Sequence, residues 1–244
     1  AVETTASGSV AYRRIDAPKD QGQRTGREAP GMAAKRSLKI STPEWVGKYA
    51  VGMDEFADEV VGAKSKNLAG LRDKIPGWIN LPASLTIPFG TFESILENHP
   101  ENAQISRDIS KLTARRVVER DPERCLREAQ ELAMEVTIPD EMWGALGEGM
   151  ARSGIEWNLG ASGAESSQRE RDQVSQAIKS VWASKFNLRA YYSLKKARLD
   201  FMDVRMAVLI QKVVNAEYAF VIHTTNPSTG DESEIYCEVV KGLG

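Results

Sequence analysis

The chain has 244 residues, of which 41% are apolar, 27% charged and 7% aromatic, a composition typical of a soluble globular protein. Its 32 Lys and Arg residues oppose 34 Asp and Glu residues. The net charge of −2 gives no overall attraction for polyanions, so we do not expect nucleic acid as a partner. No window approaches the roughly 18 consecutive apolar residues that a membrane span requires. Two cysteines and two histidines exclude a disulfide framework and a multi-histidine metal site, and we predict no metal site built by side chains alone.

Residues 1–44 combine Ser, Thr, Gly and Pro with charged side chains and show no period of 2 or 3.6, which predicts a disordered tail or linker. A transit peptide is the alternative, but its acidic residues, among them Glu3, Asp16 and Asp20, argue against it. Because the sequence starts without Met and stops at Gly242-Leu243-Gly244, we expect a fragment or a processed product.

The segment after the tail is predicted to alternate short strands with helices. Residues 45–51 suggest a short strand, and Gly62-Ala63-Lys64-Ser65 opens a helix whose apolar residues recur at helical spacing until Pro76-Gly77 ends it. Residues 79–82 and 85–90 are extended and punctuated by prolines, which favours edge or entry strands, and a further helix starts at Phe92.

The second half is predicted to be helical first and then rich in strands. Residues 104–152 carry apolar stripes at helical spacing, residues 158–172 indicate a mobile loop, and one long helix is expected over 173–199. Three apolar, β-rich runs at 206–214, 219–225 and 234–240 predict three antiparallel strands packed by that helix. The fold class is therefore α+β, with a helical insert at about 93–157 and strands at about 204–240.

The usual glycine-rich nucleotide fingerprints and the G-x-S-x-G nucleophile motif are absent. Gly62-Ala63-Lys64-Ser65 at a helix start instead offers free backbone N–H groups, the positive end of the helix dipole and the Lys64 ammonium, which suit a phosphate chain. The alternative is simple capping beside a solvated lysine.

Three polar residues in the strand-rich segment are further candidates. Gln211 interrupts an apolar run, so a buried carboxamide there would need a partner such as an adenine edge, unless strand alternation turns it outward. Glu238 is a candidate for a cation or a ribose, or an ordinary exposed carboxylate. His223 has the position of a nucleophile, but we interpret it as a hydrogen-bonded structural residue in a half-buried strand.

Several spaced blocks resemble the nucleotide-binding domain of the α-glucan, water dikinases, the starch-phosphorylating relatives of pyruvate phosphate dikinase and phosphoenolpyruvate synthase. The blocks are residues 61–68, 79–90, 181–190 and 206–227, followed by the closing Gly-Leu-Gly. The resemblance runs from about Lys48 to Gly244, and Tyr-Ala-Phe-Val-Ile-His-Thr-Thr-Asn-Pro is closer to the glucan branch than to the pyruvate branch.

The resemblance implies a truncated ATP-grasp-like module of the pyruvate phosphate dikinase type over residues 45–244. Lys64 then matches the lysine that contacts the triphosphate, Gln211 matches the glutamine near the adenine, and Arg189 matches a recurrent position without an assigned role. ATP and Mg²⁺ are the implied cofactors, and a starch-type α-glucan is the implied partner. In such enzymes the β-phosphate of ATP passes through a phosphohistidine to the glucan and the γ-phosphate goes to water, which leaves AMP. A plastid location also follows from the resemblance alone.

The chain departs from the family pattern in three respects. Residues 160–167 replace an Arg-Ser-Ser phosphate loop, the elements that hold metal and triphosphate lie beyond Gly244 in the family, and the phosphohistidine domain is missing, so no catalytic residue is assigned. His223 matches a strand residue and not the phosphocarrier. The chain is therefore expected to be catalytically incomplete by itself. The alternative is a non-catalytic, shortened paralogue that binds nucleotide, a partner or a second copy.

Overall fold

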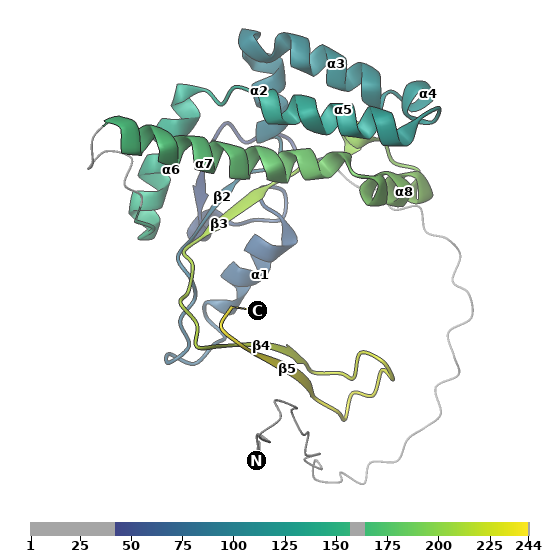
Figure 1. The fold of residues 1–244 in the computed structure, drawn as a ribbon. Helices are drawn as coiled ribbons and strands as arrows, with labels where there is room; N and C mark the ends of the chain where they lie inside the picture. Colours follow the sequence, from purple (N-terminus) through teal and green to yellow (C-terminus); the bar gives the residue numbers. More distant parts are fainter. Residues whose placement is uncertain (1–41, 157–163, 244) are drawn as a thin grey trace. The chain divides into compact units, whose positions relative to one another are not determined.

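The computed structural model describes residues 42–156 and 164–243 (Figure 1). They fall into two compact units, whose described parts are residues 42–213 without 157–163, and residues 214–243. Each unit is treated by itself. Residues 1–41 of the predicted tail and residues 158–163 of the predicted loop lie outside the described residues.

The larger unit contains a three-stranded antiparallel sheet in the order β1-β2-β3, formed by Val51–Gly52, Ser84–Ile87 and Val208–Gln211. β2 is the central strand, so the prediction of an edge strand there was wrong. The prolines that suggested an edge, Pro82 and Pro88, flank the strand and lie outside it, so both of its sides can pair.

The two faces of β2 meet different elements. Leu85 and Ile87 point into the hydrophobic core, and Leu85 lies against α6 (Asp140–Ser153), where a Cβ at Gly149 would lie 2.9 Å from a Leu85 methyl group. Because side chains alternate along a strand, Ser84 and Thr86 face the opposite way. That face meets α1 (Ala63–Leu71), since the Ser65 hydroxyl is hydrogen-bonded to the Thr86 hydroxyl at 3.0 Å.

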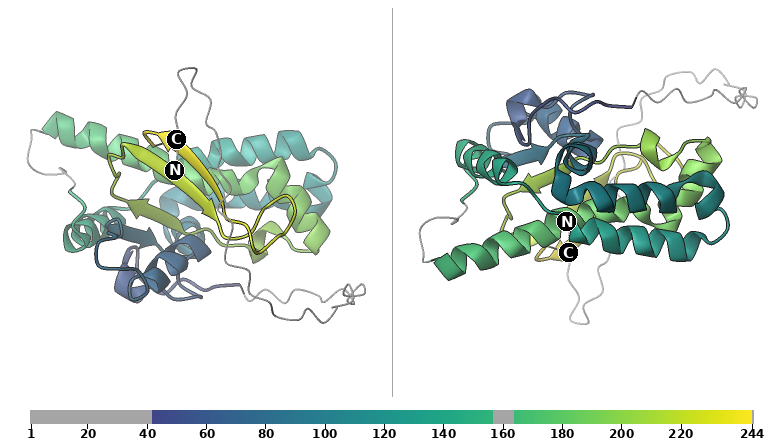
Figure 2. Two further views of the ribbon diagram at one scale, coloured as in Figure 1. Left: turned by 90° about the horizontal axis from the view of Figure 1, so that it is seen from below. Right: turned by 90° about the horizontal axis from the view of Figure 1, so that it is seen from above.

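Helices make up most of the larger unit and confirm the predicted helicity of residues 104–152. After α2 (Thr91–Asn98) come α3 (Ala103–Thr113), α4 (Arg115–Val118) and α5 (Pro122–Glu135), then α6. Asp121 caps α5 by accepting from the Arg124 N–H, and Pro122 occupies the first helical position, where its missing N–H is harmless. α5 packs between α3 and α7 (Ala164–Ala183), as Figures 1 and 2 show.

The predicted long helix over 173–199 is two helices. α7 starts at Ala164, runs into a 3₁₀ turn at Ser184–Phe186 and is followed by α8 (Leu188–Ala197). Asn187 between them is extended, and its side chain accepts from the Ala190 N–H at 2.8 Å, so it caps α8 and interrupts the helix. The predicted loop is helical from residue 164 because this stretch lacks Gly and Pro and is rich in good helix formers.

The core is continuous through this unit and centres on aromatic side chains. Trp182 is fully buried and packs against Phe92, with ring centroids 5.3 Å apart, and Phe186 packs against Phe201 at 5.7 Å. Phe201 belongs to the 3₁₀ turn Phe201–Asp203; the other short turns of this unit are Met53–Glu55 and Pro100–Asn102.

The smaller unit contains the antiparallel hairpin of β4 (Tyr218–His223) and β5 (Tyr236–Lys241). The prediction of these two strands is confirmed, but the single sheet that also included β3 was wrong. β3 pairs instead with β2, about 120 positions earlier, because Val208 and Ile210 join Leu85 and Ile87 at the core. Both α-helices and antiparallel sheets are present, so the α+β class is confirmed.

Candidate functional site

The predicted helix start at Gly62 is confirmed, and Lys64 is the second residue of α1. Gly62 is the N-cap and has no side chain that could accept from the first turn, so the N–H groups there remain available to a ligand. Lys64 is exposed, and within the described part of the chain it forms no ion pair. Lys66, by contrast, is paired with Asp58. The arrangement combines helix-dipole charge, backbone donors and an uncommitted ammonium group.

α1 ends earlier than predicted, at Leu71, and the chain continues as turns to Ile75. At this end the Arg72 N–H donates to the Ala69 carbonyl, three residues back instead of the four of an α-helix. Its position on the sheet is fixed by Ser65. This side chain is 2% exposed and bonds Thr86, which is fully buried. Lys64 is therefore carried by a helix that is fastened to the central strand by the very next residue.

Gln211 is exposed, so the prediction of a buried carboxamide was wrong. It is the last residue of β3, where the strand leaves the core. Its Nε2 donates to Ser84 Oγ at 3.1 Å, and Ser84 is its register partner on β2. The alternative of an outward-turned side chain is the one that the structure shows.

Gln211 and α1 meet the same face of the sheet. Ser84 and Thr86 are two residues apart on β2, which places them on one face about 7 Å apart. Thr86 receives α1, and Ser84 receives Gln211. Ser65 and Gln211, which are 146 positions apart in the sequence, therefore contact the same face of β2.

A cleft of about 500 Å³ opens beside this surface. Its lining residues come from the C-terminal end of α1, the segment before β2, the turn after β1 and the end of α6. Ser84 lines the cleft, whereas Lys64 and Gln211 do not. Ser84 therefore links the cleft to the candidate site. Its Oγ accepts from Gln211 and donates to the carbonyl of Pro82, another lining residue, at 2.8 Å.

The other two candidates are not brought to this surface by any contact in the described residues. Arg189 is exposed in the first turn of α8, which packs against α5. Glu238 is exposed on β5 of the smaller unit and accepts from the Tyr236 hydroxyl at 3.2 Å. Their roles stay predictions.

His223 differs from its predicted environment. It is exposed, its side chain forms no hydrogen bond within the described residues, and its ring lies 6.0 Å from that of Tyr236. The expectation of a half-buried, hydrogen-bonded residue was wrong because β4 exposes both of its faces.

Sequence reasoning missed a buried charge cluster. Lys185 Nζ lies 2.8 Å from Glu93 Oε1, and both side chains are at least nine-tenths buried. Arg205 Nη1 approaches the same oxygen at 3.5 Å, while the buried Glu93 Oε2 has no hydrogen-bond partner among the described residues. Burial lowers the pKa of Lys185, and the attraction of Glu93 works against that shift. The only signal in the sequence is a lysine between Trp182 and Phe186, two residues with core character.

Two negative findings concern the described residues alone. Within residues 42–156 and 164–243, no group of three His, Cys, Asp or Glu side chains is arranged to hold a metal ion. None of the helices in this part of the chain has the length and apolar character needed to cross a bilayer.

Comparison with known proteins shows which families the chain resembles. Residues 165–244 match the family described as pyruvate phosphate dikinase, AMP/ATP-binding domain. The chain is 40% identical over 238 residues, 98% of its length, to "Alpha-glucan water dikinase, chloroplastic" of Citrus reticulata. It is 42% identical over 211 residues, 86% of its length, to "Alpha-glucan water dikinase 1, chloroplastic" of Arabidopsis thaliana. The resemblance to the α-glucan water dikinases is confirmed.

A more distant relative has a different phosphotransferase name. "Rifampicin phosphotransferase" of Streptomyces sviceus is 24% identical over 213 residues, 79% of this chain and 24% of that protein. The chain spans 16% and 14% of the length of the two α-glucan water dikinases. Arg189, Gln211 and Glu238 lie inside the stretch that matches the AMP/ATP-binding domain, and Lys64 lies before it.

Proposed function

We propose that this chain is the ATP-binding part of an α-glucan water dikinase and that it folds as an ATP-grasp-like module. The match of residues 165–244 to an AMP/ATP-binding domain supports the proposal that the chain binds a nucleotide. The observation that carries the proposal is the open N-terminus of α1 with Lys64, held on the same sheet face as Gln211.

The phosphate chain is assigned to α1. No side chain of the described residues caps the first turn, and Gly62 brings no Cβ that would block a close approach. The Lys64 ammonium adds a full charge at this end of the helix, and the competing carboxylate of Asp58 is already engaged by Lys66. Such charge-assisted contacts are about twice as strong as neutral hydrogen bonds.

The adenine edge is assigned to Gln211. A carboxamide presents a donor and an acceptor, as the adenine edge does. The bond to Ser84 uses one of the two Nε2 hydrogens, so the other hydrogen and the carbonyl oxygen remain for a ligand. The exposed end of β3 leaves the Gln211 side chain accessible.

Magnesium is proposed to arrive with the nucleotide. Mg²⁺ keeps several waters and is commonly held by phosphates plus one or two carboxylates, so a three-residue protein cluster is not required. Glu238 is the carboxylate proposed for the cation or the ribose, and Arg189 is proposed to contact the nucleotide without an assigned role. When bound, the ion would neutralise charge that develops on the phosphates during transfer.

The whole enzyme is proposed to phosphorylate starch-type glucan with ATP and water, giving AMP and phosphate, in a plastid. The names of the relatives, which include α-glucan and chloroplastic, support the substrate and the location. The part of the reaction assigned to this chain is to bind and orient ATP. Phosphoryl transfer depends mainly on such positioning and on charge neutralisation.

The proposal is tested by titrating Mg-ATP, and AMP for comparison, into the 244-residue chain by calorimetry. Lys64→Ala should weaken Mg-ATP binding by about 1–3 kcal/mol, roughly 5- to 150-fold, because a charge-assisted phosphate contact is lost. Lys66→Ala, two positions along the same helix, is the matched control and should bind nearly as the parent does. Equal losses in both variants, or no binding by the folded parent chain, would contradict the proposal.

A further inference from the structure

The cleft beside β2 has the dimensions of a small-molecule site. Its volume of about 500 Å³ lies within the roughly 300–1,000 Å³ typical of ligand pockets. Arg72 comes from the end of α1, Arg152 from the last turn of α6, and Asp54 from the turn after β1. Three separate parts of the chain thus converge on one space without belonging to the proposed nucleotide contacts.

The charged groups of this cleft are uncommitted. Arg72, Arg152 and Asp54 form no ion pair within the described residues, although opposite charges share the same space. Two guanidinium groups offer planar arrays of donors, and one carboxylate offers acceptors only. A ligand that fits this set must accept hydrogen bonds and donate them at closely spaced atoms.

Hydroxyl groups meet that requirement because each can donate one hydrogen bond and accept two. A phosphate at the position of Asp54 would be repelled, whereas adjacent sugar hydroxyls can donate to Asp54 and accept from Arg72 or Arg152. The amide of Asn80 and the hydroxyl of Ser153, which also line the cleft, extend the same kind of contact.

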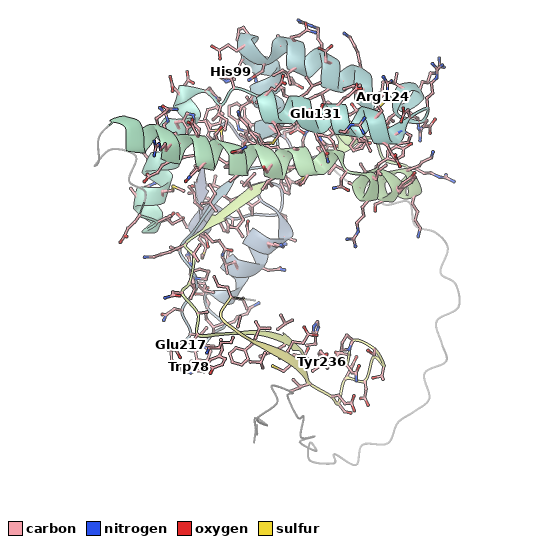
Figure 3. The ribbon with its side chains drawn as sticks, in the orientation of Figure 1. Trp78, His99, Arg124, Glu131, Glu217 and Tyr236 are labelled. Atoms are coloured by element: carbon pink, nitrogen blue, oxygen red, sulfur yellow. The ribbon has the colours of Figure 1, made fainter. Side chains whose placement is uncertain are left out.

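The loop that lines one side of the cleft carries an exposed tryptophan. Trp78 lies between the lining residues Gly77 and Ile79 and is 80% exposed, which is unusual for this residue type. Figure 3 shows it on the loop that precedes β2, away from the helices. The flat, apolar ring offers a surface for a ligand with a C–H face, and sugar rings combine such a face with hydroxyls at their edge.

We propose that this cleft, together with Trp78 on its lining loop, binds a short segment of neutral oligosaccharide, the α-glucan chain of the proposed function on which this inference rests. The sugar ring packs on Trp78, and its hydroxyls bond Asp54, Arg72 and Arg152. Ser84 belongs to the cleft and bonds Gln211, so the glucan segment and the nucleotide occupy adjoining sites.

The test is a calorimetric titration of maltoheptaose into the 244-residue chain and into Trp78→Ala and Arg152→Ala. Each variant should bind at least tenfold more weakly than the parent. Tyr192→Ala is the matched control, since Tyr192 is an aromatic residue of α8, 58% exposed and not part of the cleft, and its affinity should be unchanged. Trp78 is so exposed that its replacement should leave the fold intact, which circular dichroism verifies.

Two further ligands separate the competing outcomes. Glucose 6-phosphate tests for an anion site, and Mg-ATP tests for the nucleotide. The proposal is overturned if maltoheptaose does not bind, if Tyr192→Ala weakens it as much as Trp78→Ala, or if Arg152→Ala removes Mg-ATP binding and leaves maltoheptaose unaffected. If the parent chain binds maltoheptaose in a Trp78-dependent way but does not bind Mg-ATP, the result would instead count against the nucleotide proposal alone.

Discussion

At the scale of single residues, two lysines lie in opposite environments. Lys64 stays exposed at the start of α1, as a cation that serves a ligand must. Lys185 is 5% exposed and its charge is met inside the protein by Glu93. The sequence predicts the first because its helix start is local. It does not predict the burial of Lys185, because the partner Glu93 is 92 positions away.

Lys185→Met is expected to lower the free energy of unfolding by about 3 kcal/mol, because it leaves the buried Glu93 carboxylate with only Arg205 nearby. Urea denaturation followed by circular dichroism measures the loss. Removing both charges in Lys185→Met/Glu93→Leu should restore most of the stability, since well-packed apolar residues commonly replace a buried ion pair without loss. A double variant no more stable than the single one would show that the cost is steric.

At the scale of elements, α1 and the sheet are joined by a buried hydroxyl pair. Ser65 and Thr86 are buried, so each hydroxyl depends on the other for its hydrogen bond. This pairing holds the Lys64 turn against the strand that also receives Gln211. Helical spacing predicts α1, but the docking of α1 on β2 requires two segments to meet that share no sequence pattern.

Ser65→Ala should cost about 1–3 kcal/mol of unfolding free energy, because the Thr86 hydroxyl loses its buried partner. Thr86→Val in the same chain removes the orphaned group, so the double variant should be more stable than Ser65→Ala. Thermal unfolding of both variants beside the parent measures this order. Additive losses in the double variant would mean that the two hydroxyls do not depend on each other.

At the scale of the whole molecule, the two units differ in how much apolar surface they bury. The larger unit has a continuous core with a fully buried Trp182. The β4–β5 hairpin exposes apolar side chains on both faces, such as Phe220 at 60% and Val221 at 53%. Two paired strands with exposed apolar side chains have little stability of their own, so β4 and β5 should be locally less stable than the helices of the larger unit.

Amide hydrogen exchange should therefore be at least about a hundredfold slower in α5 and α7 than in β4 and β5, because only the helices lie against a core. Exchange followed residue by residue by NMR or mass spectrometry measures the ratio. Comparable protection in the hairpin and the helices would contradict the account of a poorly covered hairpin.

Much of the fold follows from local sequence, and most of the site does not. The helix starts at Gly62 and near Phe92 depend on neighbouring residues and are predicted. The β2–β3 pairing depends on contacts between distant segments, so β3 was placed with the wrong partners. Gln211 was expected inside a strand because its apolar neighbours run on to Val214, but the strand ends at Gln211 itself and leaves the side chain in solvent.

The central claim is that Mg-ATP binds across α1 and the end of β3. The most direct test is a ¹⁵N–¹H NMR titration of the 244-residue chain with Mg-ATP. We expect the largest shift changes at the amides of Ala63, Lys64 and Ser65 and at the side-chain amide of Gln211, with little change in the Lys195–Lys196 region of α8. Changes that spare the start of α1 while saturating elsewhere would contradict the account.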